Sequence, residues 1–309
     1  MTSQLVVSRK CPICDSARFA KLRFCKNPTD PFWRKCKNCK SIYARNIPDS
    51  KTIVEHYEGY YDGINLEIPE FVRSILAKRI NELNSYRTES NNILDIGFGA
   101  GIFLEAAQAQ GWQCFGTEYS PDSIRIGTDK GWTVHRGDLS EADLSGPFDV
   151  IAAIEVLEHV SNPAIIVNLA AQRLRKGGAF YGTTPNSQSI NVKVLGEKWS
   201  VLSFPEHQVL LCKKSLNHLR NSALLECVKI WTSGLNPRDL ITEISRIFSR
   251  ENEGDLSLSL SRNELGYKIN GHFERNKITL IIKQILNSTL SVFNVGDSLN
   301  FLLEKKSND

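Results

Sequence analysis

The chain is organised around residues 93–101, Ile-Leu-Asp-Ile-Gly-Phe-Gly-Ala-Gly. Ile93 to Ile96 is a short apolar run closed by glycines, which is typical of the end of a buried parallel strand. Glycines lack a Cβ atom, so they permit a tight turn that a ligand can approach closely. The residues from Ile102 to Gln110 have a helical pattern, and Gly111 ends it. A strand, a glycine turn and a helix N-terminus predict the first unit of a nucleotide-binding α/β fold.

The glycine spacing narrows the class of ligand. A dinucleotide fingerprint needs G-x-G-x-x-G, but here the third glycine comes one residue early and Ile102 stands in its place. No P-loop lysine follows. Asp-x-Gly-x-Gly-x-Gly at 95–101 resembles motif I of class I S-adenosylmethionine (SAM) methyltransferases. The resemblance implies that Asp95 positions the amino group of SAM and that the turn passes under its methionine part, through Gly97, Gly99 and Gly101.

Acidic residues follow the next two predicted strands. The strand from Cys114 to Thr117 ends at Glu118, and an acidic residue about 20 positions past the glycine turn suits the two hydroxyls of a ribose. Asp138 follows a third strand that starts at Val134. It resembles the family residue that accepts a hydrogen bond from the adenine amino group. The residues from Phe148 to Ile154 form a fourth apolar strand, so four features in the family's order support the resemblance.

A second informative stretch, Glu155-Val-Leu-Glu158-His159, follows the fourth strand. Ligands bind at the carboxyl ends of parallel strands, and we expect the three polar side chains to converge on one helical turn. The stretch resembles Glu-x-x-Glu-His of ubiquinone-biosynthesis O-methyltransferases and small-RNA 3′-terminal 2′-O-methyltransferases. That resemblance implies a divalent metal at Glu155, Glu158, His159 and a later histidine, His207, which would lower the pKa of an acceptor hydroxyl.

Two alternatives to the metal are open at this stretch. His159 or His207 can serve as a metal-free general base, with Glu158 beside it, or the segment can have a structural role. Glu155 is also counted among the SAM-binding residues.

Two Cys-x-x-Cys pairs lie near the N-terminus, separated by 21 residues. Each pair places two thiolates on one tetrahedral ion, and two pairs complete a closed zinc site. We therefore predict a structural zinc ribbon with the ligands Cys11, Cys14, Cys36 and Cys39. Cys25 is interpreted as a spare buried thiol.

The charge is unevenly distributed. Residues 1–45 contain eleven Lys or Arg and two Asp, a net charge of +9, so the rest of the chain carries −5 of the total +4. A basic module suits a phosphate-bearing partner such as a nucleotide-sugar, a lipid-linked glycan or RNA. The alternative is a charged surface that is only solvated.

The sequence divides into five segments. These are a zinc ribbon (1–45), a linker with a covering helix (46–90), the SAM-binding core (91–234), a helical insertion (235–295) and a terminal strand (296–309). The terminal strand resembles the antiparallel last strand of the family. Tyr57, Tyr60 and Tyr61 in the linker are candidates for closing over the SAM site, and the loop that contains Trp199 and Phe204 is expected to form an acceptor wall.

The predicted fold is therefore a Rossmann-like α/β methyltransferase sheet with an added zinc ribbon and a helical insertion. The residues after Cys39 and the tyrosine pattern resemble bacterial methyltransferases with an N-terminal zinc ribbon, many of them linked to polysaccharide or secondary-metabolite synthesis. We expect methylation of a sugar hydroxyl in glycan or nucleotide-sugar form. RNA methylation and a non-catalytic SAM-binding scaffold are the alternatives. The chain lacks an apolar run long enough to span a bilayer and an apolar signal core, so a cytoplasmic location is expected. The oligomeric state is left open.

Overall fold

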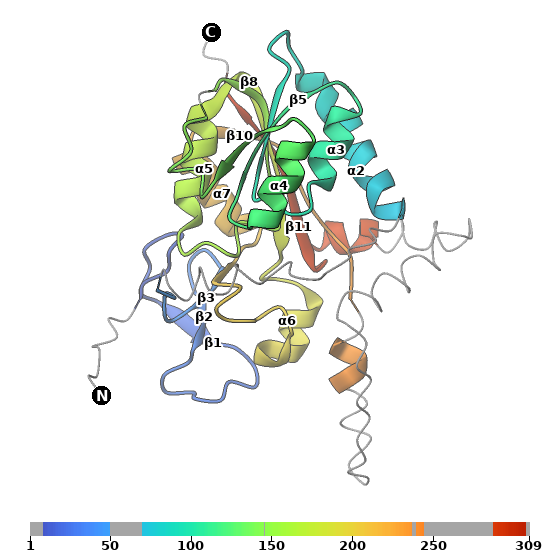
Figure 1. The fold of residues 1–309 in the computed structure, drawn as a ribbon. Helices are drawn as coiled ribbons and strands as arrows, with labels where there is room; N and C mark the ends of the chain where they lie inside the picture. The colour runs from blue at the N-terminus through green and yellow to red at the C-terminus, as the bar shows by residue number, and fades with distance from the viewer. Residues whose placement is uncertain (1–8, 50–69, 145, 237–238, 244–286, 307–309) are drawn as a thin grey trace.

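The computed structural model describes residues 9–49, 70–144, 146–236, 239–243 and 287–306 (Figure 1). The described residues form a seven-stranded sheet and a four-stranded sheet. The strands of the large sheet are β4 (Asn92–Ile96), β5 (Gln113–Glu118), β6 (Thr133–Arg136), β7 (Phe148–Ile154), β8 (Leu174–Pro185), β10 (Leu225–Ser233) and β11 (Ser298–Lys305). The helices are α2 (Glu70–Leu83), α3 (Ile102–Gln108), α4 (Pro121–Asp129), α5 (Pro163–Arg173), α6 (Ile190–Leu195) and α7 (Lys213–Ser222), with short 3-10 turns η1 (Asn84–Tyr86) and η2 (Gly196–Lys198).

The large sheet has the strand order β10-β11-β8-β7-β4-β5-β6. β4 to β8 run parallel, whereas β11 is antiparallel to both of its neighbours, β8 and β10. This arrangement confirms the predicted fold class, including the antiparallel last strand. From β4 the chain builds outward to β6 and then returns to place β7 on the other side of β4. Ligands of open α/β sheets bind at such a switch point, beyond the carboxyl ends of the strands.

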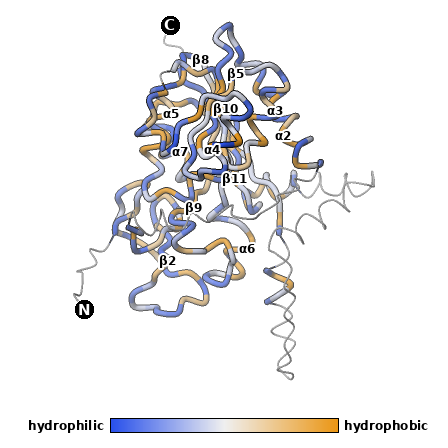
Figure 2. The backbone as a smooth tube through the Cα atoms, in the orientation of Figure 1, coloured by the Kyte–Doolittle hydropathy of each residue, from blue (hydrophilic) through white to orange (hydrophobic). Residues whose placement is uncertain are grey.

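Both faces of the large sheet are covered. Successive side chains of a strand point to opposite faces. Accordingly, Ile93 packs into a core that includes residues of α2 and α3, and Leu94 packs into a core that includes residues of α5 and α7. Hydrophobic residues are concentrated along the middle strands (Figure 2). Since both faces of β4 are buried, its sequence is apolar apart from Asn92 at its start and Asp95.

The small sheet joins the cysteine-rich segment to the core. Its strands are β1 (Phe19–Lys21), β2 (Trp33–Cys36), β3 (Ile42–Ala44) and β9 (Val209–Leu210). β9 comes from the segment predicted as the SAM-binding core, yet it pairs with β3 in antiparallel register, Ile42 with Leu210 and Tyr43 with Val209. Figure 1 shows this sheet and α6 together beneath the large sheet. The ribbon is therefore extended by a strand of the core.

Two aromatic side chains of the loop between β8 and β9 pack on the ribbon, whereas Gln208 at the end of the loop lines the cavity described below. Trp199 is buried with Trp33 and Ile42, and the ring of Phe204 meets that of Phe32 edge to face at 5.1 Å. These two aromatic side chains were expected to form an acceptor wall. Both side chains pack against ribbon residues, and neither is among the residues that line the cavity at the glycine turn.

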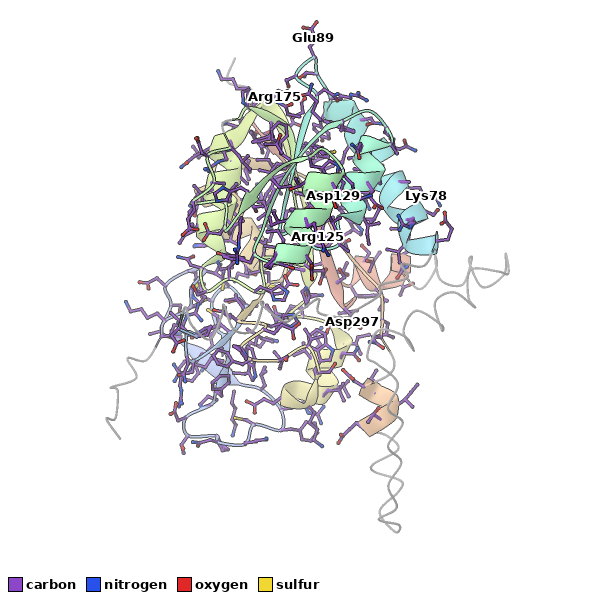
Figure 3. All side chains as sticks on the ribbon, in the orientation of Figure 1. Lys78, Glu89, Arg125, Asp129, Arg175 and Asp297 are labelled. Atoms are coloured by element: carbon purple, nitrogen blue, oxygen red, sulfur yellow. The ribbon has the colours of Figure 1, made fainter. Side chains whose placement is uncertain are left out.

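The ends of the insertion before β11 are held together by Asp297, labelled in Figure 3. Its Oδ2 accepts hydrogen bonds from Asn191 Nδ2 at 2.8 Å and from the Asn236 backbone at 2.6 Å. Burial raises the pKa of Asp297 to about 6. The predicted linker tyrosines and the centre of the insertion, residues 244–286, lie outside the described residues.

Candidate active site

The glycine turn joins β4 to α3 through left-handed backbone. Gly97, Gly99 and Gly101 have φ values of 63°, 53° and 75°, a region that L side chains rarely adopt. At Gly101 a Cβ atom would also lie 2.6 Å from the ring of Trp132. The glycines are therefore required both by the turn itself and by the close packing of β4 and α3 on their neighbours.

Glu118, at the end of β5, is fixed against this turn. Its Oε2 accepts a 2.9 Å hydrogen bond from the backbone of Gly99. Its Oε1 accepts from the backbone N–H groups of Tyr119 at 2.7 Å and Ser120 at 3.2 Å. Backbone donors therefore hold the carboxylate at the cavity, and Oε2, which accepts only one of these hydrogen bonds, has a further lone pair for a hydroxyl.

Asp95 is buried at the floor of the same cavity, with 2% of its surface exposed. Burial, and secondarily the charge of Glu118, raises its pKa to about 8. Its Oδ1 has no hydrogen-bond partner among the described residues. A bound ammonium group would donate a hydrogen bond to Oδ1 and would lower the pKa of Asp95, because a positive charge favours the charged carboxylate.

Asp138 lies after β6 in an Asx turn. Its Oδ1 accepts from the backbone N–H of Ser140 at 2.7 Å and from the Ser140 hydroxyl. The turn fixes one oxygen, and the residue lines the cavity. The three acidic residues named from the sequence therefore reach one cavity from the ends of three neighbouring strands.

The cavity has a volume of about 540 Å³, which is within the range of small-molecule sites. One side consists of the glycine turn, Glu118 and Asp138. The other side consists of the loop after β7 and of Gln208. The cavity is thus bounded by the switch-point strands and by the segment that leads to β9.

The loop after β7 is a non-helical turn, contrary to the single helical turn expected from the sequence. Glu155 has φ 53°, outside the helical region, and residues 157–159 form a turn. Glu155 also lines the cavity, where its Oε1 accepts a 2.7 Å hydrogen bond from the hydroxyl of Thr183. Glu155 is not among the three residues whose ligand atoms converge next to it.

That group consists of Glu158, His159 and His207, whose ligand atoms lie within 4.8 Å of one another. The Nδ1 of His159 lies 2.9 Å from the carbonyl of Glu206, and the Nδ1 of His207 lies 2.5 Å from the carbonyl of Val201. A carbonyl only accepts, so both contacts place the proton on Nδ1 and leave Nε2 as the acceptor nitrogen. His159 lines the cavity, whereas Glu158 is fully buried.

Glu158 is chemically the most unusual member of this group. Burial, and then the charge of Glu155, raises its pKa well above the ordinary value. Oε2 accepts a 2.9 Å hydrogen bond from Thr184, but Oε1 has no hydrogen-bond partner among the described residues. Oε1 lies 3.9 Å from His159 Nε2. Imidazole nitrogens and a carboxylate are ligands that a divalent cation uses. In such sites the other ring nitrogen of the histidine donates to a group such as a backbone carbonyl, as Nδ1 does here.

The four predicted cysteines gather in the ribbon, with their sulfur atoms within 4.8 Å of one another. Cys11 and Cys39 Sγ are 3.5 Å apart, and Cys14 and Cys36 Sγ are 3.6 Å apart. Zn–S bonds of about 2.3 Å in a tetrahedron place sulfurs roughly 3.8 Å apart, so the residues fit zinc. Cys25 lies outside the cluster, and its thiol donates to the Asn27 carbonyl at 3.3 Å. It is only partly buried, so the expected burial of this thiol was wrong.

Fold and site together define a class I SAM-dependent methyltransferase domain. The chain belongs to the family described as "Methyltransferase domain", which matches residues 68–230. It is similar to the ubiquinone biosynthesis O-methyltransferase of Xylella fastidiosa (strain 9a5c), with 33% identity over 37% of this chain and 50% of the relative. A second such enzyme, from Aromatoleum aromaticum, is 26% identical over 58% of this chain and 84% of its own. The chain thus spans about half the length of the first relatives that it matches.

Solved structures of the same fold class are also similar. A SAM-dependent methyltransferase from Archaeoglobus fulgidus matches 83% of this chain and 100% of its own, with a TM-score of 0.49 and 17% identity. Among the described residues, no helix has the length and apolar character needed to cross a membrane.

Proposed function

We propose that this chain transfers the methyl group of SAM to a hydroxyl group of a sugar, in glycan or nucleotide-sugar form. The observation that carries the proposal is the convergence of Glu158, His159 and His207 beside the cavity that Asp95 and Glu118 define. SAM supplies the reactive methyl. The protein must bind it, orient the acceptor and remove the acceptor proton.

On the SAM side each acidic residue has a separate role. Asp95 would pair with the ammonium group, Glu118 would accept from the ribose hydroxyls and Asp138 from the adenine amino group. The fit rests on the unpartnered Asp95 Oδ1 and on the left-handed glycine turn, which lets a ligand approach the backbone.

On the acceptor side we propose a divalent cation held by Glu158, His159 and His207. A bound cation lowers the pKa of a hydroxyl and orients it. Burial, and then the charge of Glu155, raises the pKa of Glu158, and such an ion would stabilise this carboxylate in its charged form. The O-methyltransferase relatives also support a hydroxyl acceptor. General-base catalysis by His159 without a metal is the outcome to be distinguished by experiment.

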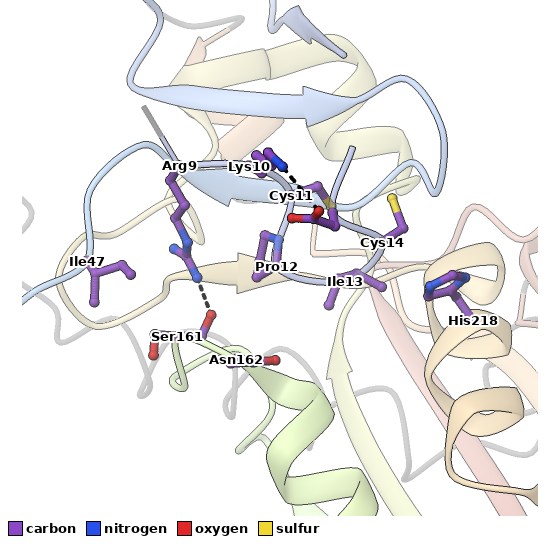
Figure 4. Close-up of a pocket in the computed structure, with 11 residues that line it drawn as sticks. Arg9, Lys10, Cys11, Pro12, Ile13, Cys14, Ile47, Ser161, Asn162 and His218 are labelled. Carbon is purple, nitrogen blue, oxygen red and sulfur yellow. Dashed lines mark hydrogen bonds and ion pairs between the residues drawn. The ribbon is translucent and has the colours of Figure 1, made fainter. Parts of the chain in front are cut away.

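A second cavity, of about 740 Å³, supports an acceptor that extends beyond the single sugar ring that would be methylated (Figure 4). It lies between the ribbon and the core and is lined by Arg9 and Lys10 on one side. Ser161 and Asn162 line both this cavity and the SAM cavity, so the two adjoin. The Arg9 guanidinium donates to the Ser161 carbonyl at this junction. The basic charge of residues 1–45 favours an acceptor that carries phosphate.

The test is methyl transfer from radiolabelled SAM to three acceptor classes: nucleotide-sugars, lipid-linked oligosaccharides and RNA. We expect label in a sugar hydroxyl, recognised by base-stable ether linkage and sugar fragmentation. Label in RNA alone would replace the proposal with the RNA alternative. Tight SAM binding without transfer to any class would favour a SAM-binding scaffold.

A further inference from the structure

Gln208 lies where the ribbon, the loop after β7 and the SAM cavity meet. Its backbone N–H donates to the Glu158 carbonyl at 2.7 Å, and its own carbonyl accepts from Ala44 of the ribbon at 2.9 Å. One residue is therefore tied by its main chain to the candidate acceptor site on one side and to the four-cysteine module on the other.

The Gln208 side chain has one oxygen atom without a hydrogen-bond partner in the described part of the chain, in a residue that lines the cavity. Nε2 donates to the His159 carbonyl at 2.7 Å, and because a carbonyl only accepts, this contact fixes the orientation of the amide. Oε1 is buried and has no hydrogen-bond partner among the described residues. Only 2% of the residue's surface is exposed, yet it lines the SAM cavity. A buried carbonyl oxygen without a partner is unfavourable, and a donor on a bound molecule would satisfy it.

The ribbon holds this region through further contacts around its second cysteine pair. β3 pairs with β9 immediately after Gln208. The Cys212 thiol donates to the Cys39 carbonyl at 3.4 Å, and the Ser187 hydroxyl donates to the Lys40 carbonyl at 2.9 Å. By contrast, the residues on the SAM side of the cavity, the glycine turn and Glu118, bond to each other and to β5.

We propose that Gln208 is a binding residue for the methyl acceptor, that its Oε1 accepts from a hydroxyl or amine of that molecule, and that the metal-loaded ribbon sets its position. The acceptor role rests on the proposed function, whereas the coupling to the ribbon does not. Release of the ribbon metal should loosen the acceptor half of the cavity and leave the SAM half intact.

The coupling is tested without any acceptor, by amide hydrogen exchange of the full chain before and after zinc is removed with a thiol-competing chelator. The reporters are Gln208 and Val209, whose N–H groups bond to the Glu158 carbonyl, and Gly97, whose N–H bonds to the Thr117 carbonyl. We expect exchange at Gln208 and Val209 to accelerate by about tenfold or more, with Gly97 and the SAM affinity unchanged. Faster exchange at Cys36, inside the ribbon, verifies metal release.

Two results would overturn the coupling. One is faster exchange at Cys36 with Gln208 and Val209 unchanged. The other is equal acceleration at Gly97, which would mean that zinc stabilises the whole chain and not one half of the cavity.

The binding role is tested with Gln208→Met, which keeps the size of the side chain and removes Oε1. The matched control is Gln188→Met, since the Gln188 amide contacts the Lys40 carbonyl at the ribbon outside the SAM cavity. With an acceptor from the transfer assay, we expect Gln208→Met to raise the acceptor KM about 5- to 100-fold without changing the SAM Kd. An unchanged KM would refute the contact. Failure to find any acceptor would contradict the proposed function, while the exchange experiment would still decide the coupling.

Discussion

The rings of His159 and His207 meet edge to face with centroids 4.8 Å apart, although one residue follows β7 and the other precedes β9. Both Nδ1 atoms lie next to backbone carbonyls, and one nitrogen of each histidine lies within 4.8 Å of that of the other and of a Glu158 carboxylate oxygen. This arrangement leads to the first prediction.

Under the cation proposal, chelation should abolish methyl transfer, and a divalent ion should restore it. The test uses protein that retains its ribbon zinc, verified by elemental analysis. His159→Ala should reduce turnover by about 10²–10⁴-fold with SAM affinity retained. Full activity after chelation, together with the same loss in His159→Ala, would show that His159 is a general base. The matched control is His135→Ala, because His135 lies in β6 (Thr133–Arg136), lines neither cavity and is outside this cluster.

The four-cysteine cluster should contain one zinc ion per chain. Elemental analysis of freshly purified protein should give a ratio near one for the wild type and for Cys25→Ser, and a ratio near zero for Cys36→Ser. The reason is that Cys36 belongs to the cluster, whereas Cys25 does not. Four freely titratable thiols at the cluster positions of the native protein would contradict this prediction.

Asp95 should make the SAM-free protein less stable as the pH rises. Its pKa is about 8 in the folded chain against an ordinary 3.8, so the folded state binds more protons between these values. The free energy of unfolding should therefore fall between about pH 4 and pH 8.

Asp95→Asn removes the buried charge. It should raise the Tm of the SAM-free protein at pH 8, by roughly 2–4 °C for each kcal/mol by which the free energy of unfolding increases. It should also weaken SAM binding. Thermal unfolding at pH 5 and pH 8 measures the difference. An equal pH dependence of Tm in the variant and the wild type would show that Asp95 does not titrate as described.

Gly101 and Gly131 provide a matched pair for the glycine turn. Their φ values are 75° and 76°, but a Cβ atom at Gly101 would lie 2.6 Å from Trp132, whereas none of the described atoms lies within 4 Å of one at Gly131. Gly131→Ala should therefore lower the free energy of unfolding by about 1–2 kcal/mol, because only the left-handed backbone is strained. Gly101→Ala should lower the free energy of unfolding by clearly more than this and should also weaken SAM binding. Denaturant unfolding compares the two, and equal losses would refute the close approach.

Much of the SAM side could be predicted from the sequence, because its signals are local. β4, the glycine turn and Glu118 follow from apolar runs, glycine spacing and the place of an acidic residue at a strand end. The four cysteines of the cluster could also be predicted, since two Cys-x-x-Cys pairs indicate a metal site without knowledge of the fold.

The acceptor side was less predictable, because it depends on contacts between distant segments. β9 is only two residues long, and its pairing with β3 has no local signal. The sequence therefore offered no reason to place Gln208 at the cavity or to expect the contacts of Trp199 and Phe204 with the ribbon. The helical turn expected at Glu155 was wrong, because that residue adopts a left-handed conformation that a charged side chain rarely takes.

The central claim is that this cavity binds SAM through the carboxylate of Glu118, and calorimetric titration of SAM tests it most directly. Glu118→Ala should lose about 2–4 kcal/mol of binding free energy, a roughly 30- to 1,000-fold rise in Kd, because two hydroxyl contacts to a charged group are removed. Glu141→Ala, an exposed acidic residue outside the cavity lining, is the control and should bind SAM as the wild type does. An unchanged Kd in Glu118→Ala, with cooperative unfolding preserved, would contradict the account.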